Sequence, residues 1–301
     1  MLGSLFASLF GSLTRTHAPR GASSELPTPG VLSVRPRTLI EFDYPYDPRS
    51  RHWDPKSKLY RLVASGADRY LDFLRSVAVF QPFYERIPVR ESAKSMPHWV
   101  NGLFPAVDAI TLYGILALHN PRRFIEVGSG NSTLFARQAI KDHRLRTSII
   151  SIDPLPRAAI DDVCDEVIRL PLEKVSRTLF DSLHEDDVIF VDNSHRAFSN
   201  SDVTVFFTEI LPDLPSGLIY GLHDIFLPLD YPEEWSNRWY NEQYLLACYL
   251  LGGARGDTIV CANAFLSVVE PRLLEPLSPI LDSPRLKGIE RTGGAFWMRR
   301  A

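Results

Sequence analysis

The chain has 301 residues, of which 45% are hydrophobic, and this is enough apolar material for a buried core. Its 33 basic and 36 acidic residues give a formal net charge of -3 and form no block of like charge. Because clustered cations are needed to bind a phosphate backbone, a nucleic-acid partner is not expected.

Three cysteines, Cys164, Cys248 and Cys261, are odd in number and widely spaced. This spacing favours reduced, packed thiols over a disulfide framework or a zinc site, and it predicts a cytoplasmic location.

Residues 1–57 are predicted to form an irregular N-terminal arm. The first twenty residues carry Leu, Phe and Ser and no acidic residue, so they resemble a weak transit peptide. Their apolar part is too short to span a bilayer. Prolines in residues 28–55 are too frequent for a regular helix or a central strand. No later apolar run reaches the ~18 residues of a membrane span, so none is expected.

Two helices are predicted between residues 58 and 120, which we interpret as a helical cap segment that contributes to a substrate pocket. In residues 58–79 apolar side chains recur at a spacing near that of a helix with one buried face. The second helix begins near Ala106 and is stopped by Asn120 and Pro121.

From residue 121 onward, short apolar runs alternate with helical segments, which is the pattern of parallel strands joined by crossover helices. The predicted strands are residues 124–127, 148–152, 166–170, 188–191, 218–222, 257–262 and 294–300. The last two lack a clear crossover helix between them and can pair antiparallel. The predicted fold class is α/β, with a Rossmann-like open and mostly parallel sheet of about seven strands and an antiparallel edge, formed by residues 121–301.

The stretch FIEVGSGNSTLFARQAI, residues 124–140, predicts a strand, a tight glycine turn and a helix. Gly128 and Gly130 allow a ligand to approach the backbone, and the helix that follows them offers free amide donors near Ser132 and Thr133. A tight turn needs glycine even when nothing binds, so GxG alone is weak evidence. Thr133 occupies the position of the third glycine of a dinucleotide fingerprint, which disfavours an NAD-dependent dehydrogenase.

Asp153 follows the second predicted strand, where an acid can accept both hydroxyls of a ribose. The alternative is a cap or turn residue ahead of Pro154 and Pro156. Glu126, two residues before the first glycine, is placed to meet a cationic or hydroxyl-bearing ligand.

Four polar residues follow the fourth and fifth strands: Asp192, His195, His223 and Asp224. They would emerge together at the carboxyl edge of the sheet, beside the glycine turn. A histidine can accept a proton, and a cation can lower the pKa of an alcohol. The alternative is that the aspartates cap loops and the histidines satisfy them.

An acid followed by GxG, with a second acid after the next strand, resembles the class I S-adenosylmethionine-dependent methyltransferases over residues 99–300. Within that superfamily the chain is similar to the branch related to macrolide-sugar and rhamnosyl O-methyltransferases. The resemblance implies S-adenosylmethionine as cofactor. The residues expected around it are Glu126, Gly128, Ser129, Gly130, Ser132, Thr133, Asp153 and Asp192.

In those relatives D-x-x-H at the fourth strand and an acidic pair at the fifth form a divalent-metal and general-base site. The resemblance implies Asp192 and Asp224 as metal ligands for magnesium or manganese and His195 as the base. This chain has His223 in place of the first acid of the pair, which puts a magnesium site in doubt. His223 is therefore either a third ligand, a base or a hydrogen-bond donor, and the catalytic candidates are His195, His223 and Asp224.

After Asp224 the chain is rich in aromatic residues, and these are interpreted either as a cover over a sugar-like or aromatic substrate or as core packing. They are Phe226, Tyr231, Trp235, Trp239 and Tyr240. The Tyr-rich part of the arm could line the same pocket or contact a second subunit, so a homo-oligomer is possible.

The sequence thus favours an S-adenosylmethionine-dependent O-methyltransferase acting on a small molecule. A metal-dependent hydroxylase or hydrolase on the same fold, as the neighbouring cephalosporin-hydroxylase-like group suggests, is a second interpretation. A non-catalytic protein that binds a cofactor or a partner is a third.

Overall fold

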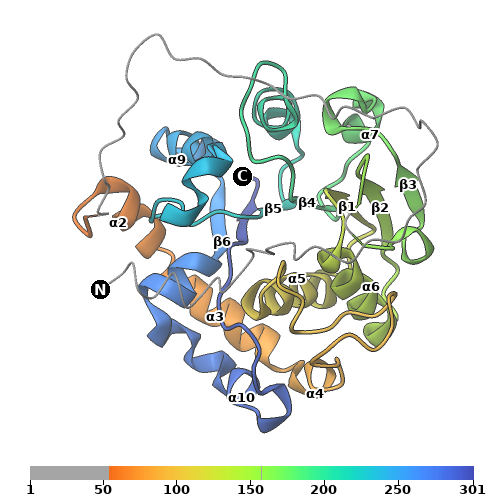
Figure 1. Ribbon diagram of the computed structural model, residues 1–301. Coiled ribbons are helices and arrows are strands. Elements are labelled where there is room, and N and C mark those ends of the chain that lie inside the picture. The colour runs from red at the N-terminus through yellow and green to blue at the C-terminus, as the bar shows by residue number, and fades with distance from the viewer. Residues whose placement is uncertain (1–53, 157) are drawn as a thin grey trace, which may run out of the picture.

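The computed structural model describes residues 54–156 and 158–301. The first 53 residues of the arm predicted for residues 1–57 therefore lie outside the described part of the chain. A central sheet runs through the molecule, and helices α5 and α6 lie side by side along one of its faces (Figure 1).

The seven strands of this sheet follow the spatial order β3-β2-β1-β4-β5-β7-β6. The neighbouring pairs from β3 to β5 are parallel, and β7 runs antiparallel to both β5 and β6. This arrangement confirms the predicted fold class. The strands are β1 (Arg123–Val127), β2 (Ser148–Ile152), β3 (Glu166–Ile168), β4 (Val188–Val191), β5 (Ile219–Leu222), β6 (Thr258–Ala262) and β7 (Phe296–Arg299).

The strand order reverses direction between β1 and β4, where the chain leaves β1 on one side and returns on the other. In open α/β sheets ligands bind at this point, beyond the carboxyl ends of the strands. The central strands β4 and β5 are buried at every position, which is typical of parallel strands covered on both faces.

Helix α5 is buried along most of its length and packs against α6, α3 and the sheet. Its left-handed C-cap is Asn120, as the sequence predicted. The α-helices are α2 (Lys58–Ala64), α3 (Ala67–Ala78), α4 (Gln81–Tyr84), α5 (Ala106–His119), α6 (Asn131–His143), α7 (Arg177–Asp181), α8 (Asp202–Val205), α9 (Glu242–Leu251) and α10 (Ser278–Leu281). Among the described helices none combines the length and the apolar character needed to cross a membrane.

The single helix predicted for residues 58–79 is broken into α2 and α3 at Ser65 and Gly66. In a continuous helix the carbonyl of Val63 would accept the backbone amide four residues later. Here it accepts the Tyr70 hydroxyl at 2.8 Å and the Gly66 amide at 3.2 Å. A side chain at Gly66 would meet the Tyr70 ring at 2.4 Å. The buried tyrosine therefore takes the space and the acceptor that a straight helix would use.

A buried ion pair anchors the end of the chain at the amino edge of the parallel strands. Arg300 contacts Asp257 at 2.7 Å, and the hydroxyls of Tyr220 and Tyr249 donate to the same carboxylate. We expect Asp257→Asn to lower the free energy of unfolding by about 2 kcal/mol, because a charge-assisted network loses its charge. Urea denaturation measures this, and a variant as stable as the native protein would contradict it.

Candidate active site

The functional candidates gather at the carboxyl ends of β1, β4 and β5. Val127, Val191 and Leu222 are in register as the last residues of these strands. The backbone pairing continues one residue further, because the amide of Asp192 donates to Val127 (2.7 Å) and the amide of His223 donates to Val191 (2.9 Å). Side chains that are distant in sequence are thereby fixed at one edge of the sheet.

The two glycines of the turn after β1 are required for different reasons. Gly128 has a φ of 77°, and a Cβ there would lie 1.8 Å from the carbonyl oxygen of Asp192. The close approach of the β1 and β4 ends therefore depends on it. Gly130 has extended backbone, and a Cβ there would meet nothing within 4 Å. Open space thus lies above Gly130, as a bound ligand would need.

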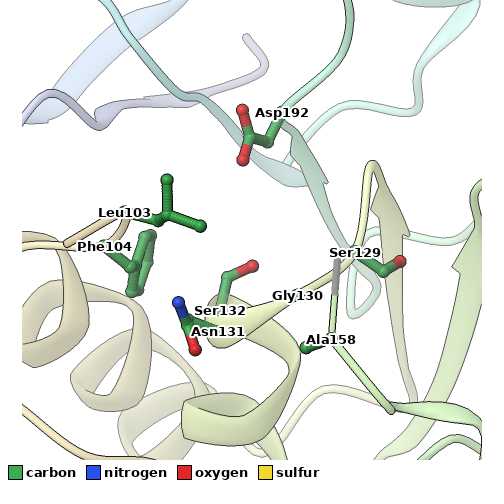
Figure 2. A pocket seen from close by; sticks show the side chains of 8 residues that line it. All are labelled: Leu103, Phe104, Ser129, Gly130, Asn131, Ser132, Ala158 and Asp192. Atoms are coloured by element: carbon green, nitrogen blue, oxygen red, sulfur yellow. The ribbon is translucent and has the colours of Figure 1, made fainter. Parts of the chain in front are cut away.

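This space belongs to a first cavity, located where α6 begins (Figure 2), with about 430 Å³ of empty space that includes the open solvent at its mouth. Free amides at a helix start favour negatively charged or hydrogen-bond-accepting ligand groups. The side chain of Asp192 faces the α6 start across the cavity (Figure 2). The lining residues are Leu103, Phe104, Ser129, Gly130, Asn131, Ser132, Ala158 and Asp192.

Glu126 lies fully buried beneath the turn. Its Oε2 accepts the hydroxyl of Thr133, and the Thr133 oxygen in turn accepts the amide of Gly130. Its Oε1 has no hydrogen-bond partner among the described residues. Burial raises the pKa of Glu126 to about 8. Thr133, which stands where a dinucleotide fingerprint has glycine, thus connects the turn to this acid.

Asp153 holds the turn against the end of β2. Its carboxylate accepts the amides of Ser129 at 2.8 Å and Leu155 at 2.7 Å, and Ser129 also bonds the Ser151 hydroxyl at 2.7 Å. The turn-residue interpretation is therefore realised. Each carboxylate oxygen keeps a second lone pair, so this does not exclude contact with a ribose.

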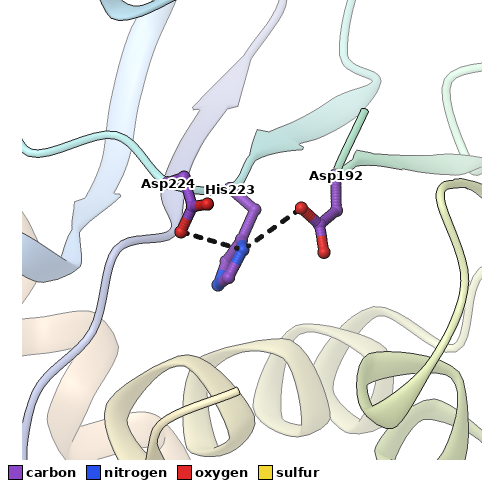
Figure 3. Close-up of side chains that lie close together, drawn as sticks. All are labelled: Asp192, His223 and Asp224. Atoms are coloured by element: carbon purple, nitrogen blue, oxygen red, sulfur yellow. Dashed lines mark ion pairs between the residues drawn. The ribbon is translucent and has the colours of Figure 1, made fainter. Parts of the chain in front are cut away.

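Beyond β4 and β5 two histidines bracket two aspartates. His195 Nε2 lies 3.1 Å from Asp192 and 3.3 Å from Asp224. His223 Nδ1 lies 3.4 Å and 3.5 Å from the same two carboxylates, between which Figure 3 shows it. His195 and Asp224 both adopt left-handed backbone, with φ of 58° and 54°. Such strain in non-glycine residues clusters at functional sites.

Two buried acids that the sequence did not single out hold the far side of each ring. Asp108 in α5 contacts His223 Nε2 at 3.1 Å, and Glu242 in α9 contacts His195 Nδ1 at 2.9 Å. Asn193 donates to the other oxygen of Glu242 at 3.0 Å. Asp108 stands alone in an otherwise apolar helical stretch, and that isolation was an available signal. Glu242 begins α9 between Asn241 and Gln243 and carries no such signal.

The carboxylates control the protonation of this cluster. Burial alone would lower the pKa of both histidines. The nearby carboxylates outweigh burial and hold both pKa values well above the ordinary value. Asp192 and Asp224 act on both rings, Glu242 acts on His195, and Asp108 acts on His223. Burial raises the pKa of Asp192, but the two imidazoles lower it by more. The pKa of Asp192 therefore lies well below its usual range. In the absence of a cation, the surrounding carboxylates therefore favour the protonated, cationic form of both imidazoles.

A divalent cation fits the residues on one side of this cluster. Asp192, His223 and Asp224 each offer one ligand atom, a carboxylate oxygen or an imidazole nitrogen, and these three atoms lie within 4.8 Å of one another. Nδ1 of His223 is buried and has no hydrogen-bond partner in the described part of the chain. An imidazole nitrogen between two carboxylates is a suitable donor set for a metal ion.

A second cavity, with about 600 Å³ of empty space that includes open solvent, is lined by Asp192, His223 and Asp224 and shares Leu103 and Asp192 with the first. Phe226, Trp235 and Tyr240 line it, while Phe226 and Trp235 also pack with Ala264 in a small apolar cluster. The cover and packing interpretations thus both apply to these rings. The guanidinium of Arg238 lies 3.9 Å from the centre of the Trp235 ring and also lines the cavity.

Comparison with known families places part of this edge in context. Residues 125–225 match a family model described as a methyltransferase domain, and this span contains the glycine turn, Asp153 and the β4 and β5 ends. The match confirms the methyltransferase resemblance predicted from the sequence. An uncharacterized protein of Archaeoglobus fulgidus is 29% identical over 92 residues, which are 29% of this chain and 42% of that protein. The chain thus spans less than half of that relative.

Several solved structures are also similar to this chain. A Podospora anserina methyltransferase with S-adenosylhomocysteine bound is 17% identical, covering 79% of this chain and 96% of its own, with a TM-score of 0.38. A Bacillus cereus O-methyltransferase with the same ligand is 11% identical, with the same coverages and TM-score. The Streptomyces achromogenes O-methyltransferase TomG is 13% identical, covering 74% and 96%, with a TM-score of 0.37. Because these TM-scores are below 0.5, the likenesses do not by themselves assign an activity.

Proposed function

We propose that this chain, of which residues 125–225 match a methyltransferase domain, transfers the methyl group of S-adenosylmethionine to a hydroxyl group of a small molecule. One observation carries the proposal: the cavity over the glycine turn and the cavity over the histidine–aspartate cluster meet at Asp192 and Leu103. A methyl donor in the first cavity would face an acceptor in the second. Such placement converts a bimolecular reaction into an effectively intramolecular one.

The first cavity would hold the cofactor. S-adenosylmethionine supplies an electrophilic methyl group when bound. Gly130 leaves space for it, and Asp153 at the end of β2 suits its ribose. Oε1 of Glu126, which has no hydrogen-bond partner among the described residues, suits its ammonium group.

The second cavity would hold the acceptor, with Asp192, His223 and Asp224 as ligands of a divalent cation. A cation held there would lower the pKa of the acceptor hydroxyl and offset the negative charge of the two aspartates. His195, whose Nε2 faces both aspartates and whose ring is oriented by Glu242, would accept the proton as the carbon–oxygen bond forms. The aromatic side chains of this cavity suit the apolar face of a sugar or an aromatic ring.

Transfer of a labelled methyl group tests this proposal. The native protein is incubated with methyl-labelled S-adenosylmethionine, Mn²⁺ and a panel of sugars and phenols, and with matched analogues whose hydroxyls are replaced by hydrogen. Label is expected in hydroxyl compounds only. Equal labelling of the matched analogues that lack the hydroxyl would contradict O-methylation.

The raised pKa of Glu126 leads to a further prediction. An acid with a pKa near 8 is mostly protonated at pH 7, and a cationic ligand group beside it favours ionisation. We therefore expect S-adenosylmethionine binding at pH 7 to release up to about one proton. Calorimetry in buffers of different ionisation enthalpy measures the release, and Glu126→Gln should abolish it. Equal release by both proteins would place the ligand ammonium elsewhere.

A further inference from the structure

Asp108, in the first turn of α5, lies directly behind His223 and is fully buried. Its carboxylate accepts the amides of Gly294 and Ala295, at 2.8 Å each, and the side-chain amide of Asn263 at 2.7 Å. The remaining contact is His223 Nε2 at 3.1 Å. Three fixed N–H donors keep the Asp108 carboxylate ionised, and an ionised carboxylate only accepts hydrogen bonds. Nε2 of His223, which faces it, must therefore carry a hydrogen and donate.

The tautomer of a neutral His223 follows from this contact. With the ring hydrogen on Nε2, the lone pair is on Nδ1, which lies between Asp192 and Asp224, 3.4 Å and 3.5 Å from their carboxylates (Figure 3). A carboxylate behind a histidine, with the other ring nitrogen facing acidic oxygens, is how proteins orient an imidazole toward a metal ion and raise its basicity.

We infer that Asp108 is a positioning residue that, through His223, gives this site a preference for a transition-metal ion such as Mn²⁺, Co²⁺ or Zn²⁺ over Mg²⁺. The inference rests on the proposed cation site. Mg²⁺ demands oxygen ligands in near-ideal octahedral geometry, whereas an imidazole nitrogen suits the first-row transition metals. With two carboxylates and one fixed imidazole, the site offers a mixed set of one nitrogen and two oxygen donors.

The selectivity is measured by titrating the chelator-treated protein with Co²⁺ and with Mg²⁺ in a calorimeter. Transition metals bind most sites more tightly than Mg²⁺, so the informative quantity is the ratio of the two dissociation constants in native and variant proteins. The double variant Asp108→Asn/His223→Glu replaces the nitrogen by oxygen and leaves an amide that can donate to the new carboxylate. Its ratio of Mg²⁺ to Co²⁺ dissociation constants should be at least about tenfold smaller than the native ratio.

The single variant Asp108→Asn tests the positioning role. The new side-chain amide N–H at position 108 would donate to His223 Nε2, so the lone pair would lie on Nε2 and the ring hydrogen on Nδ1. A protonated Nδ1 cannot ligate a metal ion, so Co²⁺ affinity should fall by about 10- to 100-fold. In native Co²⁺ protein, proton NMR should show an exchangeable ring N–H signal shifted by the paramagnetic ion. Asp108→Asn and His223→Gln should both lack it, while Asp257→Asn, which alters a buried acid at the other edge of the sheet, should keep it.

Two results would overturn the inference: an unchanged ratio in the double variant, or native Co²⁺ affinity in folded Asp108→Asn. If Asp108→Asn does not fold, the double variant and His223→Gln decide. Binding of S-adenosylmethionine in the presence of chelator is measured separately. Cofactor binding without a metal preference would remove this inference alone, whereas the absence of cofactor binding would remove the proposed function.

Discussion

Replacing His195 by Gln is expected to lower the rate of methyl transfer by about 10²- to 10⁴-fold, which is the usual contribution of a positioned general base. The imidazole is 2% exposed, its Nε2 faces Asp192 and Asp224, and Glu242 fixes its other nitrogen. Gln can still donate to one carboxylate but cannot take up a proton. The turnover number is measured with whichever hydroxyl compound the native protein methylates.

Two controls separate lost chemistry from lost structure. The affinity of His195→Gln for S-adenosylmethionine should stay within about threefold of the native value, because no contact to the first cavity is removed. His184→Gln changes an exposed histidine that precedes β4 at the opposite edge of the sheet, so its turnover should equal the native turnover. A His195→Gln rate within threefold of the native rate would exclude His195 as the base.

Gly128→Ala is expected to reduce the free energy of unfolding by about 3 to 5 kcal/mol and to eliminate cofactor binding. The left-handed backbone costs a side chain roughly 1–2 kcal/mol, and a Cβ 1.8 Å from the Asp192 carbonyl oxygen forces the β1 and β4 ends apart. Backbone atoms of a central sheet cannot move aside as a flexible side chain can. Urea denaturation followed by calorimetry with S-adenosylmethionine measures both effects.

Gly130→Ala is the matched control. Its backbone is extended and the added methyl group would meet no protein atom within 4 Å, so its stability should be close to native. The methyl group would enter the first cavity, however, and should weaken S-adenosylmethionine binding by at least about tenfold. Native cofactor affinity in folded Gly130→Ala would show that the ligand does not lie over this turn.

The sheet could be predicted from the sequence because each strand is a short apolar run closed by turn residues. The predicted runs 148–152 and 188–191 coincide with β2 and β4. In β4 burial at every position leaves an unbroken apolar run, and in β2 three isoleucines carry the signal. The break between α2 and α3 could not be predicted from the apolar spacing alone. It depends on Tyr70 filling the space beside Gly66, which is a tertiary contact within a locally helical pattern.

The site could be predicted in part. Asp192, His195, His223 and Asp224 each follow a strand, and parallel strands bring their carboxyl ends to one edge, so their proximity follows from the topology. Asp108 and Glu242 were missed because they reach the cluster from α5 and α9. Asp108 meets His223 across 115 positions of sequence, and such pairing has no local signature. Only Asp108, isolated among the apolar residues of α5, gave an indication of a buried partner.

Calorimetric titration of the native protein with S-adenosylmethionine, and then with S-adenosylhomocysteine, tests the central claim most directly. It is run in chelator and again with Mn²⁺. We expect dissociation constants on the order of micromolar for both compounds, about −8 kcal/mol, with binding weakened by Gly130→Ala. The absence of binding of either compound under both conditions, by a protein whose folding is verified by its urea transition, would contradict the assignment of this edge as a methyltransferase site.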